Sequence, residues 1–481
     1  MQQNKDGVRK LLRQSGLFSL ALLFISSTHA AENFKDFKRT QSRAFTYYKD
    51  AKDKEFSRYL HSSWQEYSSQ KEATLYKKGK PKNIYSATPQ KIHGVGPLTN
   101  ITLPKKKVSK KQIHIARVAK DISFSFFGQY VTLDVDNTIK GAKYYPHNQN
   151  GIAYFFDLLA HSKYEDTLRE IIKRSDALRL NDWGRYLLVQ KTSQEIYAKK
   201  DEQKLYTWFM LNKMGYDVKV GLSQKHILLM HYSKKTIYAV PSYIFKKKSY
   251  YVVDTYDQKN LPRVYTYLQH YPKATKDLDL SLNVLPNFEE NLYTKTLSFQ
   301  YFGATYPITF KYDKNLIDFM ATYPQADYET YFNAAFSEET FTQIAEGIKK
   351  YIDGKKASEA INFVLNFVQK SFKYERDQAQ FGREKVMFAY ETLYYNSSDC
   401  EDRATLFAFL VHKLFKIGVI GVKYKDHMAT GLNIPLQGDS VKFAQHRFVI
   451  ADPTYIDANI GQSMPQYKFK SPEHFIVLQS E

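Results

Sequence analysis

The feature that most restricts the fold of this 481-residue chain is an internal repeat. Three pairs of segments match in the same order along the chain: DISFSFFGQYVTLDV (121–135) with TLSFQYFGATYPITF (296–310), DEQKLYTWFMLNKMGYDVKVG (201–221) with CEDRATLFAFLVHKLFKIGVIGV (400–422), and YYVVDTY (250–256) with RFVIADPTY (447–455). Ordered matches with slowly drifting offsets indicate a duplication, and chance similarity among Tyr- and Lys-rich segments is the alternative. We therefore expect two related modules.

Each copy is predicted to hold short strands, a helical stretch, one buried helix and further strands, which places the fold in the α+β class. Alternation such as SFSFF and β-branched runs such as RFVIA indicate the strands. Residues 401–415 predict a helix with a wide apolar face, and Gly418 follows as its stop.

The first 30 residues predict export. A basic stretch precedes an apolar core at residues 17–25, and SSTHA offers a small-residue cleavage site after Ala30. The core is too short for a stable membrane span, and no later run approaches the roughly 18 apolar residues that a span needs. We expect a periplasmic or secreted protein that is soluble once its signal peptide, residues 1–30, is removed.

Residues 31–78 predict one long polar helix, a helical arm. Its aromatic side chains recur every 11 residues, which keeps them in one stripe along the helix: Phe34, Phe45, Phe56 and Tyr67. The stripe could dock on the body of the protein, the interpretation we favour, or on a second copy. Residues 79–110, rich in Lys, Pro and Gly, predict an extended linker. The two modules would then occupy residues 111–285 and 290–481.

The net charge of +21 favours anionic partners such as lipid headgroups or acidic wall polymers. The lysines are scattered in short runs, however, so a solvated basic surface is the simpler interpretation. No nucleic-acid motif occurs, and we expect no nucleic-acid partner. Association with the envelope surface and the oligomeric state stay open.

Cys400 is the only cysteine, which excludes a disulfide within the chain. A single cysteine in an exported protein is reactive, paired between chains, or buried and inert. His427 and Asp452 follow it, and thiol catalysis needs a base and a group that orients the base. Helix-capping residue types at 396–399 place the thiol at a helix N-terminus, which stabilises a thiolate.

One feature opposes an activated thiol. Asp399, Glu401 and Asp402 surround Cys400 with negative charge, which should raise its pKa unless they point elsewhere. We interpret Glu401 and Asp402 as capping and loop-anchoring residues, and His412 as structural. Neither metal-ligand spacing nor a glycine-rich phosphate loop occurs, so no cofactor and no metal are expected.

The stretches SDCEDRATLFAFLV, DHMATGLNI and FVIADPTYI resemble the core of the transglutaminase-like superfamily. FKYERDQAQFGREKVMFAYETLYYNSSDCEDRA is similar to its bacterial exported branch, and the resemblance covers residues 360–470, with 111–275 as a worn copy. It implies a papain-like core in which a buried helix carrying the Cys packs on an antiparallel sheet carrying the His and the Asp.

The resemblance assigns Cys400 as nucleophile, His427 as general base and acid, and Asp452 as the residue that orients the histidine. Gln380 becomes a candidate for completing the oxyanion hole. The family's Gly-Asp-Cys or Gly-x-Cys and its His-Ala-Trp are replaced here by Ser398-Asp399-Cys400 and His427-Met428-Ala429. These departures leave the triad intact and the substrate open.

In the first copy Asp201 stands where the thiol would be, while His226 and Asp254 persist. That module is predicted to be degenerate and to serve binding or scaffolding.

The expected activity is attack of Cys400 on an amide bond of a peptide, protein or cell-wall substrate. Hydrolysis by a cysteine protease or amidase is favoured over transamidation. The alternatives from other classes are a papain-fold binding or scaffold protein without turnover, and an interaction protein organised by the aromatic helix.

Overall fold

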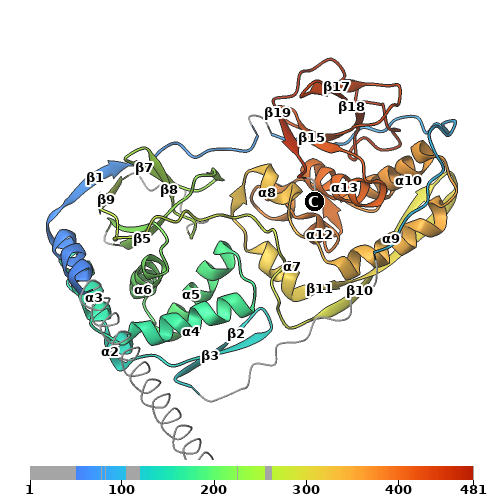
Figure 1. Ribbon diagram of the computed structural model, residues 1–481. Coiled ribbons are helices and arrows are strands. Elements are labelled where there is room, and N and C mark those ends of the chain that lie inside the picture. Colours follow the sequence, from blue (N-terminus) through green and yellow to red (C-terminus); the bar gives the residue numbers. More distant parts are fainter. Residues whose placement is uncertain are drawn as a thin grey trace, which may run out of the picture.

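The computed structural model describes residues 50–76, 79–81, 83–104, 120–224, 226–254 and 263–479. The fold is mixed α+β with antiparallel sheets, as expected. Two halves lie side by side, and the N-terminal segment runs from the first half across to the second (Figure 1). Within the described residues, no helix combines the length and the apolar character that crossing a membrane requires.

The first half begins with a hairpin followed by helices. These elements are β2 (Ile122–Phe126), β3 (Gln129–Leu133), α2 (Asn137–Gly141), α3 (Gln149–Ala160), α4 (Tyr164–Ala177), α5 (Asp182–Ile196) and α6 (Lys200–Lys213). A six-stranded antiparallel sheet follows, in the order β1 (Trp64–Ser68), β9 (Arg263–Tyr267), β4 (Val218–Ser223), β5 (His226–Tyr232), β8 (Lys248–Tyr251) and β7 (Ser242–Phe245). A bridge from Gln70, just after β1, to Ser242 of β7 nearly closes this sheet.

The second half has the same sequence of element types. It contains a long hairpin and helices, namely β10 (Leu292–Tyr301), β11 (Ala304–Asp313), α7 (Lys314–Ala321), α8 (Tyr328–Phe332), α9 (Glu338–Ile352), α10 (Ala357–Lys370), α11 (Asp377–Gln380), α12 (Ala389–Thr392) and α13 (Cys400–Phe415). Its antiparallel sheet has the order β17 (Ser440–Phe443), β18 (His446–Ala451), β16 (Met428–Leu432), β15 (Val419–Lys423) and β19 (His474–Val477). Two short pairings, of β6 (Ile237–Tyr238) with β12 (Gln325–Ala326) and of β13 (Lys373–Tyr374) with β14 (Ser397–Ser398), complete the described strands.

The two leading hairpins turn in the same way. Phe127 and Gly128 between β2 and β3, and Phe302 and Gly303 between β10 and β11, all have positive φ. Two consecutive residues in this region form the primed turn that matches the twist of a two-residue hairpin. The matching turns and element order agree with the predicted duplication, which stays a prediction.

Helix α13 confirms the prediction for residues 401–415. It is buried on nearly all sides, because its apolar residues pack against α10 and α12 as well as against β15 and β16. Its stop differs from the prediction: Lys416, in the left-handed region with φ 56°, ends the helix, and Gly418 does not.

The predicted helical arm is wrong in its second part. The helix that starts within the arm ends at residue 62, and Trp64–Ser68 form strand β1 against β9 instead of continuing to residue 78. Pairing with β9 buries Trp64 against Tyr265 and Tyr267, which outweighs helical periodicity. The predicted positions Phe34 and Phe45 lie outside the described residues.

The described part of the aromatic stripe docks on the body of the protein. Phe56 is buried against Phe156, Trp208, Tyr267 and Tyr271 of the first half. For this part of the arm, the favoured alternative is confirmed.

The predicted linker is irregular in structure but it is not a free spacer. Residues 83–104 run along the second half, with backbone hydrogen bonds from Ala87 to Ile456 (2.8 Å) and from Thr99 to Lys355 (2.8 Å). Residues 105–110 lie outside the described part of the chain.

Candidate active site

The N-terminus of α13 is held by the segment that precedes it. The backbone N–H of Asp399 donates to Asp402 at 3.3 Å, and the second carboxylate oxygen of Asp402 accepts from Met387 N–H at 2.8 Å. Capping and anchoring by Asp402 are thereby confirmed. These bonds fix the position of Cys400 as the first residue of the helix.

Arg403 anchors the same turn from inside the protein. Its guanidinium is buried and donates to the Gln369 carbonyl (3.1 Å), the Phe372 carbonyl (2.8 Å) and the Ser398 hydroxyl (3.1 Å). Buried carbonyls need a hydrogen-bond donor, and Arg403 supplies it here. The position of the chain segment that leads into Cys400 therefore depends on Arg403.

His427 and Asp452 form a buried pair at one end of the second sheet. Nε2 of His427 lies 2.8 Å from Oδ2 of Asp452, and His427 stands immediately before β16, which pairs with the strand that precedes Asp452. The other Asp452 oxygen accepts from the N–H groups of Thr454 (2.9 Å) and Tyr455 (3.2 Å). Asp452 therefore holds the turn that follows it and also bonds to the imidazole of His427.

Two further side chains support this pair. Gln369 donates from Nε2 to the carbonyls of Asp452 (3.0 Å), Tyr455 (2.7 Å) and Ala458 (3.1 Å). The ring of Tyr467 stacks on His427 with centroids 4.7 Å apart. The imidazole is thus held in one plane, with Nε2 engaged and Nδ1 as the nitrogen left for a proton from a substrate or thiol.

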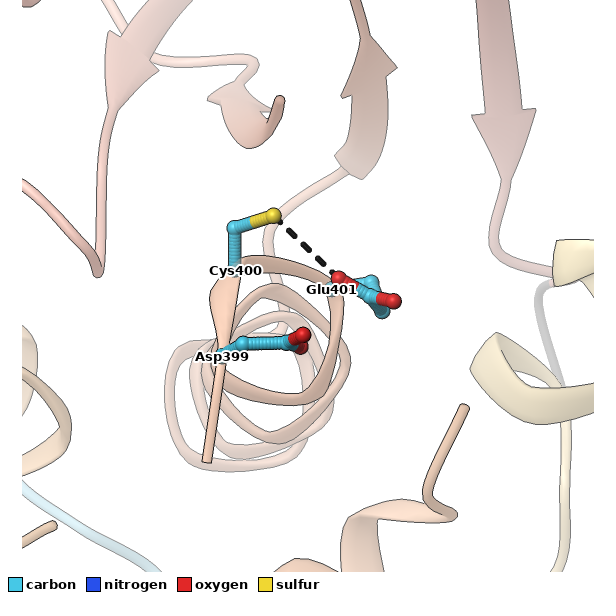
Figure 2. A group of neighbouring side chains, drawn as sticks. All are labelled: Asp399, Cys400 and Glu401. Atoms are coloured by element: carbon cyan, nitrogen blue, oxygen red, sulfur yellow. Dashed lines mark hydrogen bonds between the residues drawn. The ribbon is translucent and has the colours of Figure 1, made fainter. Parts of the chain in front are cut away.

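The thiol of Cys400 is hydrogen-bonded to Glu401 and not to His427. Sγ lies 3.2 Å from Oε2 of Glu401 (Figure 2), and the Tyr76 hydroxyl lies 3.7 Å from Sγ and 3.0 Å from the same carboxylate oxygen. Cys400 is 0% exposed. The structure therefore brings two of the three predicted catalytic residues into contact and holds the third in a covered state at the end of the adjoining helix.

The surroundings of the thiol oppose its ionisation. Burial raises the pKa of Cys400 well above its usual value, and the charges of Glu401 and Asp399 raise it further; Lys80 acts in the opposite direction. Glu401 anchors the segment of Tyr76 and Lys80, in line with its predicted loop-anchoring role, and its side chain also accepts the hydrogen bond of the thiol, which was not predicted.

Lys80 lies at the centre of a buried carboxylate pocket. Its ammonium donates to Asp377 (2.7 Å), Asp399 (2.5 Å) and Glu401 (2.6 Å), and Glu384 lies 3.0 Å away at the rim. Burial alone would lower the pKa of Lys80, but these carboxylates raise it well above its usual value. In return Lys80, against the effect of burial, lowers the pKa of Glu401 to about 2.

The same pocket has the composition of a cation site. Oxygens of Asp377, Glu384 and Glu401 lie within 4.8 Å of one another, as metal ligands would. The Lys80 ammonium bonds to this set, so a lysine side chain supplies the cation here.

The other predicted site residues lie away from the thiol. Gln380, on α11, places Nε2 3.4 Å from the Ser397 carbonyl and makes no hydrogen bond to Cys400, so its oxyanion role stays a prediction. His412 bonds through Nδ1 to the Ile417 carbonyl at the end of α13 (3.0 Å), which confirms it as structural.

In the first half, His226 does not pair with Asp254, the aspartate that matches Asp452. His226 is exposed and lies 3.8 Å from Asp201, and Asp254 forms an ion pair with Lys204 at 3.1 Å. This arrangement agrees with a degenerate copy without thiol chemistry.

Tyr76, Lys80 and Asp377 escaped the sequence analysis. Tyr76 and Lys80 were assigned to the arm and the linker, and they reach Glu401 from 325 and 321 residues away. No local pattern predicts such contacts. The one indication in the sequence is the excess of acidic residues around Cys400, because several carboxylates at a helix start need a cation beside them if they are buried.

Comparisons with protein-family models, with curated proteins and with solved structures give no match.

Asp377→Asn should change how stability depends on pH. Burial, and to a lesser degree Glu401, raise the pKa of Asp377 from 3.8 to about 7 in spite of Lys80. A carboxyl whose pKa is raised by folding stabilises the protein below pH 4, and this stabilisation is lost as the pH rises through about 7.

Urea unfolding at pH 5 and at pH 8 measures this effect. The free energy of unfolding of the wild type, relative to Asp377→Asn, should fall between the two pH values. An equal difference at both would show that Asp377 does not titrate in this window.

Proposed function

We propose that the second half is a thiol acyl-transfer enzyme of the transglutaminase-like type, with Cys400, His427 and Asp452 as its catalytic triad. The observation that carries the proposal is the buried 2.8 Å contact between His427 and Asp452, which lie at the ends of two paired strands of the sheet. Helix α13, which packs against this sheet, begins with the only cysteine of the chain. A buried imidazole–carboxylate pair is the arrangement that activates a nucleophile.

The reaction steps follow from the hydrogen bond between Nε2 of His427 and Asp452. His427 donates Nε2–H to Asp452, so Nδ1 accepts the proton of the Cys400 thiol. The thiolate then attacks the carbonyl carbon of an amide, and the imidazolium protonates the leaving amine, giving a thioester. Water or an amine, deprotonated by His427, releases the acyl group and regenerates the thiol. Water gives hydrolysis, which we favour, and an amine gives transamidation.

The covered thiol corresponds to a resting state. In that state Glu401 and Tyr76 are the partners of Cys400, and the thiol is neutral because its pKa is raised by burial and by Glu401. Catalysis requires these partners to withdraw so that the thiol can meet His427.

The wider setting of the proposal comes from the sequence. A signal peptide at residues 1–30 and the basic composition support an exported enzyme acting on peptide, protein or cell-wall amides near the envelope surface. The first half would be a duplicated copy that has lost its nucleophile and serves binding or scaffolding.

The test measures alkylation of Cys400 by iodoacetamide against pH in a variant without both partners of the thiol, Tyr76→Ala/Glu401→Gln, and in the same variant with His427→Ala added. An ion pair with His427 keeps a thiolate reactive well below pH 7, so we expect labelling at pH 6 that is at least about tenfold faster when His427 is present. Labelling that requires about pH 8.5 in both variants would overturn the triad.

Turnover is then measured with labelled casein. Peptide release, or incorporation of a fluorescent primary amine, should require Cys400 and should disappear in Tyr76→Ala/Cys400→Ser. The ratio of the two products decides between hydrolysis and transamidation.

A binding protein without turnover is the second candidate. The raised pKa of the Cys400 thiol and its bond to Glu401 favour it, since both keep the nucleophile neutral. This candidate predicts that uncovering the thiol leaves it with an ordinary pKa.

A further inference from the structure

The segment that covers Cys400 comes from the start of the chain and joins both halves. It consists of the described residues 70–76, 79–81 and 83–104, and we call it the strap. One end is bonded to the first half through Gln70 and Ser242 (2.8 Å), and the other to the second half through Thr99 and Lys355 (2.8 Å). Figure 1 shows it in blue, passing from the first half to the second. The middle of the strap crosses the N-terminus of α13.

Two side chains of the strap enter the site. The Tyr76 hydroxyl reaches both Sγ of Cys400 (3.7 Å) and Glu401 (3.0 Å). The Lys80 ammonium, buried together with its side chain, bonds to three carboxylates at 2.5–2.7 Å. Pro81 is held next to it through its carbonyl, which accepts from the Tyr374 hydroxyl at 2.9 Å.

The carboxylate pocket has more acceptors than Lys80 uses. Oδ1 of Asp377 and Oδ1 of Asp399 are buried, and neither has a hydrogen-bond partner within the described structure. Buried carboxylate oxygens without partners are costly, and a cationic donor is what they lack. The contacts of the pocket are therefore with the ammonium group itself, and they do not require that the group belong to Lys80 of the strap.

We propose that the strap is an intramolecular inhibitor of Cys400, latched by the Lys80 ammonium in a pocket that accepts other primary alkylammonium groups in its place. The inhibitory role rests on the function proposed above, whereas the latch concerns only access to the thiol. Withdrawal of one ammonium removes three charged contacts and frees Tyr76 to leave the thiol. A ligand carrying primary ammonium groups would hold the strap open by occupying the pocket.

The first experiment measures access to the thiol at pH 9.5 with iodoacetamide. Lys80→Met keeps the length of the side chain but removes its charge, and it should label at least about tenfold faster than the wild type because the strap opens more often. Lys213→Met is the matched control: Lys213 is a buried lysine that bonds to Asp53 in the first half, and its loss should leave the labelling rate of Cys400 unchanged.

The second experiment restores the missing ammonium. In Lys80→Ala, n-propylammonium can supply the atoms that the substitution removes, so millimolar n-propylammonium should raise the melting temperature of this variant while leaving that of the wild type unchanged. Tetramethylammonium, which has no N–H donor, should have no effect on either. Circular dichroism shows whether Lys80→Ala is folded. It also shows whether Lys80→Met is folded. If Lys80→Met is not folded, Tyr76→Ala, which leaves the ion pairs intact, replaces it in the labelling assay and should also label faster than the wild type.

The outcomes separate the latch from the catalytic triad. Faster labelling of Lys80→Met and rescue by n-propylammonium support the latch even if His427 proves to have no effect on thiol ionisation. Equal labelling of Lys80→Met and wild type, with both folded, overturns the latch whatever the triad does. Equal stabilisation by tetramethylammonium would show a salt effect and would overturn the ammonium specificity of the pocket.

Discussion

Replacing Glu401 with Gln should make Cys400 several-fold more reactive towards iodoacetamide at pH 8, because losing a neighbouring negative charge lowers the pKa of the thiol and so raises its thiolate fraction. The carboxylate of Glu401 accepts from the thiol at 3.2 Å, and its charge is the largest influence after burial that raises the thiol pKa. Removing the charge lowers the pKa of Cys400. It also replaces one of the ion pairs that hold Lys80 with a weaker hydrogen bond to a neutral amide, which increases access to the thiol.

The measurement is the second-order labelling rate between pH 6 and pH 10. A shift of the rate profile to lower pH would show that the pKa of the Cys400 thiol has fallen. An equal increase in rate at every pH would show that the thiol has become more accessible. Glu391→Gln is the control, since Glu391 is a buried carboxylate paired with Lys385 at 2.6 Å, in the same half. An unshifted profile in Glu401→Gln would show that the carboxylate does not set the ionisation of the thiol.

Arg403→Met should destabilise the second half by about 3–5 kcal/mol, the cost of removing a buried charged group and leaving its partners unsatisfied. The substitution leaves the buried carbonyls of Gln369 and Phe372 without their donor. Burial lowers the pKa of Arg403 to about 10, so the guanidinium is charged at neutral pH. Equilibrium urea unfolding measures the change.

Arg447 provides the control for this substitution. It too bonds to two carbonyls and one serine hydroxyl, those of Leu436, Gly438 and Ser440, but it lies at the more exposed edge formed by β17 and β18. Because water replaces the lost donor there, Arg447→Met should cost roughly 1 kcal/mol or less. Equal losses in the two variants would contradict the importance of burial at Arg403.

Local periodicity explains which parts of the fold were predictable. The helix at 401–415 and the strands around SFSFF and RFVIA could be predicted because their signals lie within a few residues of one another. The contact between His427 and Asp452 was anticipated from the resemblance, because no local pattern links two residues that lie 25 positions apart.

The rest depended on contacts between distant segments. Residues 64–68 carry a helical pattern, but pairing with β9 makes them a strand, and β9 lies nearly 200 residues away in the sequence. Likewise nothing near Lys80 indicates that its charge is buried among Asp377, Asp399 and Glu401. The acidic residues around Cys400 therefore allowed the negative charge near the thiol to be predicted. They did not reveal which distant residues contact the thiol and those carboxylates.

The path of the N-terminal segment has a consequence for the order of folding. Strand β1 needs β9 as its neighbour, and Lys80 needs carboxylates that follow it by 297 to 321 residues. Closing loops of this length carries a large entropic cost, and the contacts that compensate for it exist only after the distant segments have folded. The residues that leave the ribosome early are thus among the last to reach their final places, and a chain that stops short of α13 has no site to receive Lys80.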